Sequence, residues 1–95
     1  MTDDVKPAEW LAENKEWQSD ESGRLVREYQ FADFVSAFSF LYKVSVEAEK
    51  MNHHPDFSLY SWNRVRIILY THSENAVTAS DMKLASTIEQ IFGRQ

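Results

Sequence analysis

Pro55 constrains the fold of this chain more than any other single residue, because it separates two segments of opposite character. A proline has no backbone N–H, and its ring pushes the preceding residue toward extended geometry. Residues 32–52 carry apolar side chains at helical spacing, so the helix predicted there has to end before Pro55. His54 is then expected to be non-helical, and His53 to lie just past the last helical turn. The residues after Pro55 alternate between apolar and polar, which is typical of strands.

The other segments have periodicities and caps of their own. Asp3 or Asp4 can cap a first helix with Pro7 in its first turn, and Thr78 with Asp81 matches a capping box. With turns at 21–23 and near 63–64, the predicted elements are, in chain order, a helix through about residue 14, a strand from residue 17, a strand over 24–31, the helix over 32–52, strands over 58–63 and 65–72, and a helix from 78 to about 93. This order predicts an α+β fold with antiparallel strand pairs.

The strands are expected to bury one face each. In 24–31, Leu25, Tyr29 and Phe31 share a face, while Val26 and Arg27 interrupt the alternation slightly. In the last strand, alternation predicts one face made of Val65, Ile67, Leu69 and Thr71 and an opposite face made of Arg66, Ile68, Tyr70 and His72.

The long helix is apolar over a wide arc. The i, i+3, i+4, i+7 spacing predicts a buried stripe of Phe34, Val35, Phe38, Leu41, Tyr42 and Ala48. Further apolar surface lies outside that stripe, at Phe40, Val44 and Met51. Such a width indicates either a subunit interface or a deeper core, and the spacing leaves both open.

The composition narrows the class of protein. The chain has 95 residues, a net charge of −5 and no cysteine. We expect one domain over residues 1–95 with a short acidic tail at 1–5, and self-association, because so short a chain builds a deep pocket poorly. The absence of cysteine, of a signal-peptide pattern and of a long apolar run predicts a cytoplasmic protein without membrane association. The sequence has no cluster of Lys and Arg residues, so direct nucleic-acid binding is not expected.

The three histidines of the chain fall at predicted element ends. His53 and His54 follow the long helix, and His72 ends a strand. Imidazole exchanges protons near neutral pH, and Glu49 lies one helical turn before His53. Each of these side chains also has an ordinary interpretation as a structural or solvated residue. The spacing matches no zinc motif, so a zinc site is not expected. These residues alone predict a small α+β domain with a possible histidine-lined cleft.

A set of residues in a fixed order adds a family resemblance. Glu49, the run His53-His54-Pro55, then Trp62, His72 and Asp81 resemble the signature of the pterin-4a-carbinolamine dehydratases. Further likeness runs through Trp17 and residues 25–34 and 84–90, and it covers about residues 10–92 in all. The resemblance implies a four-stranded antiparallel sheet with three helices packed on one face. It also implies homodimers formed by sheet extension and homotetramers formed through the long helix.

The resemblance also implies a reaction. Family members are hydro-lyases that dehydrate 4a-hydroxytetrahydropterin to quinonoid dihydropterin by histidine acid–base catalysis, without a cofactor. By this likeness His53 and His72 are the expected proton-transfer pair, and His54 mainly binds the pterin; which histidine acts as acid stays open. The other residues expected at the substrate are Glu49, Asn52, Tyr70, Thr71 and Trp17, and those expected to support the site are Pro55, Trp62 and Asp81.

Two functions follow from the same resemblance. The first is the dehydratase in tetrahydrobiopterin recycling, acting with an aromatic amino acid hydroxylase, or in another pterin pathway. The second is a non-catalytic interaction protein, since animal members also act as dimerisation partners of a transcription factor through the long helix. Some positions depart from the animal pattern: Asn52 replaces Asp, Tyr70 replaces Ser and Ser73 replaces Glu.

Overall fold

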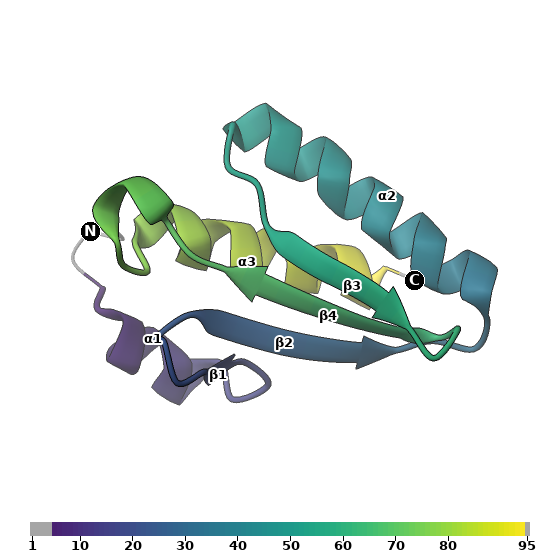
Figure 1. Cartoon of the computed structure of the whole chain (residues 1–95), viewed down its shortest axis with the longest axis horizontal. Helices are drawn as coiled ribbons and strands as arrows, with labels where there is room; N and C mark the ends of the chain where they lie inside the picture. The colour runs from purple at the N-terminus through teal and green to yellow at the C-terminus, as the bar shows by residue number, and fades with distance from the viewer. Residues whose placement is uncertain (1–4, 95) are drawn as a thin grey trace.

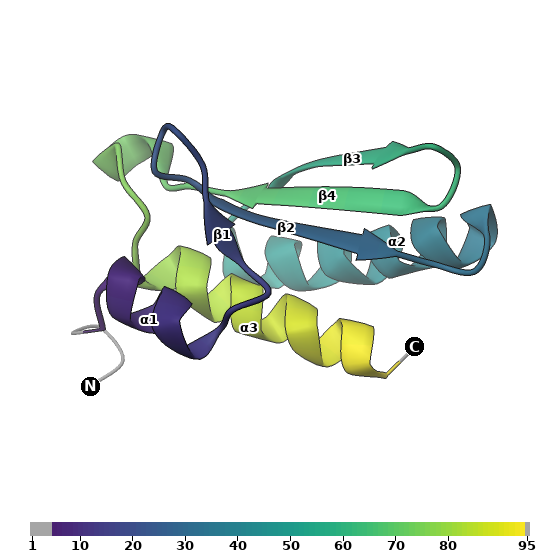
Figure 2. The same cartoon turned by 90° about the horizontal axis from the view of Figure 1, so that it is seen from below.

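A four-stranded antiparallel sheet with three helices on one face makes up the computed structural model, which describes residues 5–94 (Figures 1 and 2). The strands are β1 (Gln18–Ser19), β2 (Leu25–Gln30), β3 (Asp56–Tyr60) and β4 (Arg64–Leu69), in the spatial order β1-β2-β4-β3. The helices are α1 (Pro7–Glu13), α2 (Phe34–Met51) and α3 (Ala79–Gly93), with a short 3-10 helix η2 at His72–Glu74. The predicted fold class and the placement of the helices are confirmed.

The central pair, β2 and β4, carries the sheet side of the core. Leu25 lies opposite Leu69, and Tyr29 lies opposite Val65. The odd-numbered residues of both strands therefore point to the face of the sheet that the helices cover. Of the predicted face, Val65, Ile67 and Leu69 are fully buried, whereas Thr71 follows the end of β4 and is half-buried. Arg27 does not interrupt the alternation as expected: its position shares the face of Leu25 and Tyr29, and its guanidinium ends on Glu89 of α3.

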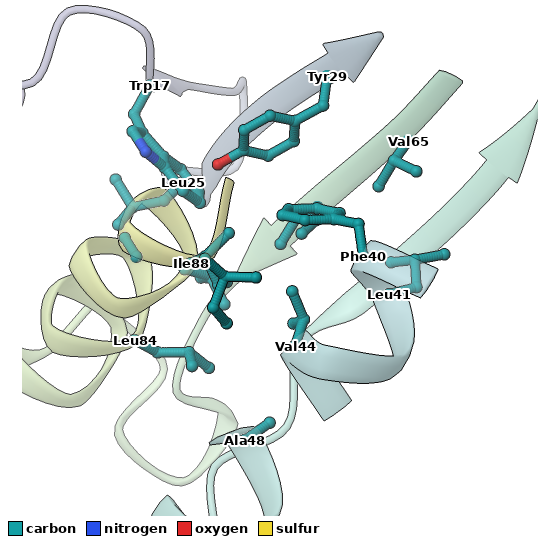
Figure 3. Close-up of a cluster of buried hydrophobic side chains, with 14 of the residues drawn as sticks. Trp17, Leu25, Tyr29, Phe40, Leu41, Val44, Ala48, Val65, Leu84 and Ile88 are labelled. Atoms are coloured by element: carbon teal, nitrogen blue, oxygen red, sulfur yellow. The ribbon is translucent and has the colours of Figure 1, made fainter. Parts of the chain in front are cut away.

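The predicted buried stripe of α2 was largely wrong. Phe34, Val35, Phe38 and Tyr42 are exposed, whereas the buried residues are Ala37, Phe40, Leu41, Val44 and Ala48. Both arcs have helical spacing, so the pattern alone did not say which one meets the sheet and α3. Figure 3 shows Phe40, Val44 and Ala48 on the side of α2 that faces Leu84 and Ile88 of α3.

The β3–β4 hairpin sits slightly differently from the prediction. Tyr60 pairs with Arg64, so the loop covers residues 61–63. Its Ser61 and Trp62 lie two residues earlier than the expected turn, and both have positive φ (48° and 58°). Left-handed backbone at two consecutive residues lets this short loop reverse the chain between the two strands. Asn63 then ties the hairpin to the start of α2, because its side-chain amide donates to the Phe31 carbonyl over 2.9 Å.

The N-terminal part differs from the predicted tail and cap. Val5 packs against the core, and α1 begins after Lys6 with Pro7 in its first turn. The predicted caps Asp3 and Asp4 lie outside the described residues. Within residues 5–94 no helix has the length and hydrophobicity needed to span a membrane.

Candidate functional site

The predicted His-His-Pro turn is built by the way α2 ends. Asn52 has a left-handed backbone (φ 51°), its N–H donates to the Glu49 carbonyl over 3.1 Å, and the His53 N–H donates to the Ala48 carbonyl over 3.1 Å. These two bonds form a Schellman motif with asparagine in the usual glycine position. The motif stops the helix at Met51 and turns the chain so that His53 leaves it toward α3. Asn52 therefore has a backbone role, and its side chain is exposed.

Asp81 is the most buried polar residue near this turn, with no accessible surface. It occupies the third position of α3, where its Oδ2 accepts from the Thr78 N–H over 2.9 Å, as the predicted capping box requires. The same oxygen accepts from the Thr71 hydroxyl over 2.7 Å, and the Thr71 and Thr78 hydroxyls lie 2.8 Å apart. Asp81 thus joins the end of β4 to the start of α3.

His53 completes the hydrogen bonds of Asp81. Its Nε2 lies 2.5 Å from Oδ1 of Asp81, and its side chain is 15% exposed. Every buried side-chain nitrogen and oxygen of the described residues has a hydrogen-bond partner. No bond to Nδ1 of His53 occurs in this part of the chain, so Nδ1 must reach the surface. The imidazole therefore has one nitrogen on a buried carboxylate and one open to a ligand.

His54 stands beside this pair in a far more open setting. Its Nε2 lies 3.0 Å from Oε1 of Glu49, and the two side chains are 62% and 81% exposed. A contact this exposed contributes little to stability because water competes with it. It does leave an imidazole and a carboxylate next to each other at the surface.

His72 was predicted to end a strand, but β4 stops at Leu69 and His72 begins η2. The loop is closed by the Thr71 N–H, which donates to the Ala76 carbonyl over 3.0 Å, and by the Tyr70 hydroxyl, which donates to Asn75 Oδ1 over 2.8 Å. The ring of Tyr70 meets the imidazole of His72 edge to face at 5.3 Å between centroids. These contacts fix where the exposed His72 ring stands.

The segments that carry the three histidines, the connection from α2 to β3 and the start of η2 after β4, lie at the same end of the sheet (Figure 1). In the antiparallel pair β3 and β4, the first residue of β3 and the last residue of β4 lie at the same end of the sheet. The segments that carry His53, His54 and His72 therefore meet there. Among residues 5–94, no hydrogen bond or ring contact joins one imidazole to another, and no group of three His, Asp or Glu side chains could hold a metal ion. Three proton-exchanging groups at one end of the sheet can serve acid–base chemistry.

Two predicted site residues do not open onto this end of the sheet. Trp17 is only 3% exposed and donates from Nε1 to Glu89 over 3.1 Å, so in this chain it has almost no surface for a ligand. Trp62 is exposed at the far turn of the β3–β4 hairpin. Thr78 and Asn75 were missed as site residues. The capping box did name Thr78, but its bond to Thr71, seven residues earlier, depends on how the intervening loop folds.

A second polar cluster lies farther along α3, around Glu89. Its Oε1 accepts from Arg27 Nε over 2.7 Å, from the Tyr29 hydroxyl over 2.6 Å and from Trp17. Burial raises the pKa of Glu89, but these hydrogen bonds and the Arg27 charge outweigh it and hold the pKa below its ordinary value. Burial and the bond to Glu89 raise the pKa of Tyr29. None of the three histidines belongs to this cluster.

Comparisons with known proteins agree on one family. The family model described as "Pterin 4 alpha carbinolamine dehydratase" matches residues 2–91. A relative in Metallosphaera sedula is 45% identical over 71 residues, covering 75% of this chain and 73% of its own. A relative in Chloroflexus aggregans is 38% identical over 85 residues, covering 90% and 89%. The names of both assign them provisionally to pterin-4-alpha-carbinolamine dehydratase.

Solved structures agree as well. The crystal structure of a transcriptional coactivator/pterin dehydratase from Brucella melitensis matches with a TM-score of 0.79 and 35% identity, covering 92% of this chain and 96% of that one. A pterin dehydratase-like protein identified as a RuBisCO assembly factor of the alpha-carboxysome shares the fold, with a TM-score of 0.67 at 15% identity, over 80% of this chain and 88% of that one.

Proposed function

We propose that this chain, which belongs to the pterin 4 alpha carbinolamine dehydratase family, removes water from 4a-hydroxytetrahydropterin to give quinonoid dihydropterin. In this reaction the bond from C4a to its hydroxyl oxygen breaks, and the oxygen leaves as water once it has gained a proton. N5 loses its proton as the C4a=N5 double bond forms. Both proton transfers suit imidazoles that work near neutral pH.

The observation that carries this proposal is the pairing of His53 with the fully buried Asp81. A histidine held through one nitrogen by a carboxylate, with the other nitrogen accessible, is the arrangement of a general acid or base. His72 stands on the neighbouring loop and is the proposed second proton-transfer group. His54, which is exposed beside Glu49, is proposed to bind and orient the flat pterin ring.

The remaining predicted contacts are refined by their positions. Thr71 and the backbone at Tyr70 border His72, and we propose that they contact the ring as the family resemblance implies. Glu49 would act by holding His54. We leave Trp17 out of the proposed site because it is buried in the core. The proposed setting is cytoplasmic pterin recycling beside an aromatic amino acid hydroxylase.

The direct test is turnover of synthetic 4a-hydroxytetrahydropterin by the purified protein. Water is also lost without enzyme, so the measured quantity is the rate above buffer. We expect a rate enhancement that scales with protein concentration and disappears in the His53→Ala/His72→Ala double variant. A wild-type rate equal to that of buffer would defeat the enzymatic proposal.

A second candidate function is favoured by the exposed apolar arc of α2. Phe34, Val35, Phe38 and Tyr42 present apolar side chains that a single chain leaves uncovered. We propose that this face forms a homodimer or homotetramer, and that it can alternatively bind a partner protein. The relative from Brucella melitensis is described as a transcriptional coactivator as well as a pterin dehydratase.

Sedimentation of the wild type and of Phe38→Glu tests this face. We expect a dimer or tetramer that dissociates when the charge is introduced, while Phe57→Glu on edge strand β3 separates sheet pairing from helix pairing. A wild-type monomer at micromolar concentration would contradict self-association and leave binding of a partner protein as the function of this face. Absence of turnover in the dehydratase assay would favour that function further.

A further inference from the structure

We infer that Asp81 fixes His53 in the tautomer with its proton on Nε2, so that Nδ1 is the atom that takes a proton from the substrate. This inference rests on the proposed function for its chemistry, but its structural half concerns the free protein. It assigns Asp81 a positioning role, and it makes Thr71 the residue that positions Asp81. The hydrogen-bond chain from Thr78 to His53 carries the argument.

The direction of that chain follows from what each group can donate. The Thr71 hydroxyl donates to Oδ2 of Asp81, so in its 2.8 Å contact with Thr78 it accepts, and the Thr78 hydroxyl donates. Oδ2 also accepts the Thr78 N–H. Two donors whose protons do not titrate therefore occupy Oδ2. The second oxygen, Oδ1, faces only Nε2 of His53 among the described residues.

An ionised carboxylate with no accessible surface needs a donor on each oxygen, because an unpaired buried charge is costly. Nε2–H of His53 is the available donor for Oδ1. A neutral imidazole that carries its proton on Nε2 has its lone pair on Nδ1. Nδ1 is the nitrogen that reaches the surface, so it is the one that can meet N5 of the pterin.

The consequence for the reaction is a division of labour. His53 takes the N5 proton on Nδ1, the electron pair of that N–H bond forms C4a=N5, and the C4a–O bond breaks. The departing hydroxyl takes its proton from another group at the rim, His72 in the proposed function, and leaves as water. The imidazolium formed on His53 is stabilised by Asp81, to which it still donates from Nε2.

The tautomer can be read directly by long-range ¹H–¹⁵N correlation of histidine-labelled protein, at a pH where the His53 ring is neutral. In the wild type without substrate we expect the proton on Nε2. In Asp81→Asn the amide NH₂ can donate to Nε2, so the proton should move to Nδ1, the wrong nitrogen for the substrate. We expect kcat to fall by at least tenfold while KM changes by less than about threefold.

Thr71→Val removes one donor from Oδ2 at nearly constant volume and keeps the capping box. We expect an intermediate fall in kcat and a detectable fraction of the Nδ1–H tautomer. Thr87→Val is the matched control, because Thr87 also gives up a hydroxyl bond, to the Lys83 carbonyl 3.1 Å away on the exposed face of α3. It should leave both the tautomer and kcat unchanged.

Two results would overturn the inference: a wild-type His53 with its proton on Nδ1, or an Asp81→Asn protein with wild-type tautomer and kcat. The tautomer in the wild type and in Thr71→Val still decides the matter if Asp81→Asn does not fold. It also decides the matter if no turnover occurs, which would defeat the proposed function and leave the positioning of His53 by Asp81 standing.

Discussion

Helix α3 carries two carboxylates that accept several hydrogen bonds from other elements, and they differ in who donates. Glu89 accepts from Trp17, Arg27 and Tyr29, three groups that keep their protons at neutral pH. Asp81 accepts from Thr71, Thr78 and His53, and an imidazole can change its charge in that range. Donors that never titrate make a structural clamp, whereas a titrating donor with a second open nitrogen makes a reactive group.

The two clusters also differ in what lies on their far side. The guanidinium carbon of Arg27 lies 4.1 Å from the ring centroid of Tyr29 and 5.7 Å from that of Phe92. The Glu89 cluster therefore packs against the aromatic side chains of the core. His53 continues from Asp81 to the surface beside the exposed His54 and the His72 loop. The comparison therefore separates the molecule into an end that should govern activity and an end that should govern stability.

The sharpest separation is expected from alanine at the proton-transfer pair. His53→Ala and His72→Ala should each lower turnover of 4a-hydroxytetrahydropterin by more than tenfold and up to about 10³-fold, because each removes one positioned proton-transfer group. Both proteins should keep their fold, because His72 is exposed; His53→Ala should also lower the free energy of unfolding, since it leaves Oδ1 of the buried Asp81 without its donor. Initial rates and circular dichroism on the same samples check this.

The matched variant for these two is Trp62→Ala, which removes an exposed aromatic at the far turn of the hairpin. It should keep the wild-type rate in the same assay. Near-normal rates in the double variant of His53 and His72 would contradict this assignment, because the end of the molecule that carries the histidines would then not be needed for turnover.

Glu89 should show the reverse pattern. Glu89→Gln removes the charge that faces Arg27 and weakens the acceptor shared by Tyr29 and Trp17. The free energy of unfolding should fall by about 1–2 kcal/mol, between the values for exposed and for buried ion pairs. Turnover should stay within twofold of the wild type. Urea denaturation at fixed protein concentration measures the first quantity, and the dehydratase assay measures the second.

Glu47→Gln provides the control for that variant. Glu47 pairs with Lys50 across an exposed turn of α2 at 3.2 Å, so its loss should cost less than about 0.5 kcal/mol. Equal losses of stability in the two variants would mean that the Glu89 cluster is no more than a surface ion pair.

Acidification should weaken the Glu89 cluster in a definite direction. The pKa of Glu89 in the folded protein lies below its ordinary value of 4.5, so its contribution to stability is present above that value and is lost as the pH falls through the lower, folded pKa. The difference in unfolding free energy between the wild type and Glu89→Gln should therefore shrink between about pH 5 and pH 3. A difference that is constant across this range would contradict the assignment.

Much of the fold could be predicted from sequence because its signals are local. The end of α2 followed from Pro55, and the start of α3 from the Thr78 capping box, and both are confirmed. The buried face of α2 could not be predicted, since Phe38 and Phe40 lie on two arcs of equal spacing and only the position of α3 separates them. The large exposed aromatics drew the prediction to the wrong arc.

The candidate site shows the same limit. His53, His54 and His72 were singled out by their places at element ends, from neighbouring residues. The neighbours of Asp81 predicted only a helix cap, and its place at the site came from the family resemblance. The bond from Asp81 to His53 spans 28 residues and depends on the end of α2 meeting the start of α3. Arg27 was read as a break in a strand for the same reason, because its partner Glu89 lies 62 residues away. Periodicity gives faces and ends, but not which polar groups meet across them.

The smallest effect is expected at His54, and it tests how far the active end extends. His54→Ala should raise KM for the pterin several-fold and lower kcat by less than about threefold, because this exposed ring binds substrate rather than transferring its protons. Glu49→Gln should raise KM less, since it removes only the carboxylate that lies 3.0 Å from His54. Steady-state kinetics over a wide range of substrate concentration separates the two constants. A loss confined to kcat would instead make His54 a third proton-transfer group, and the active end would then contain a reactive histidine that no buried carboxylate positions.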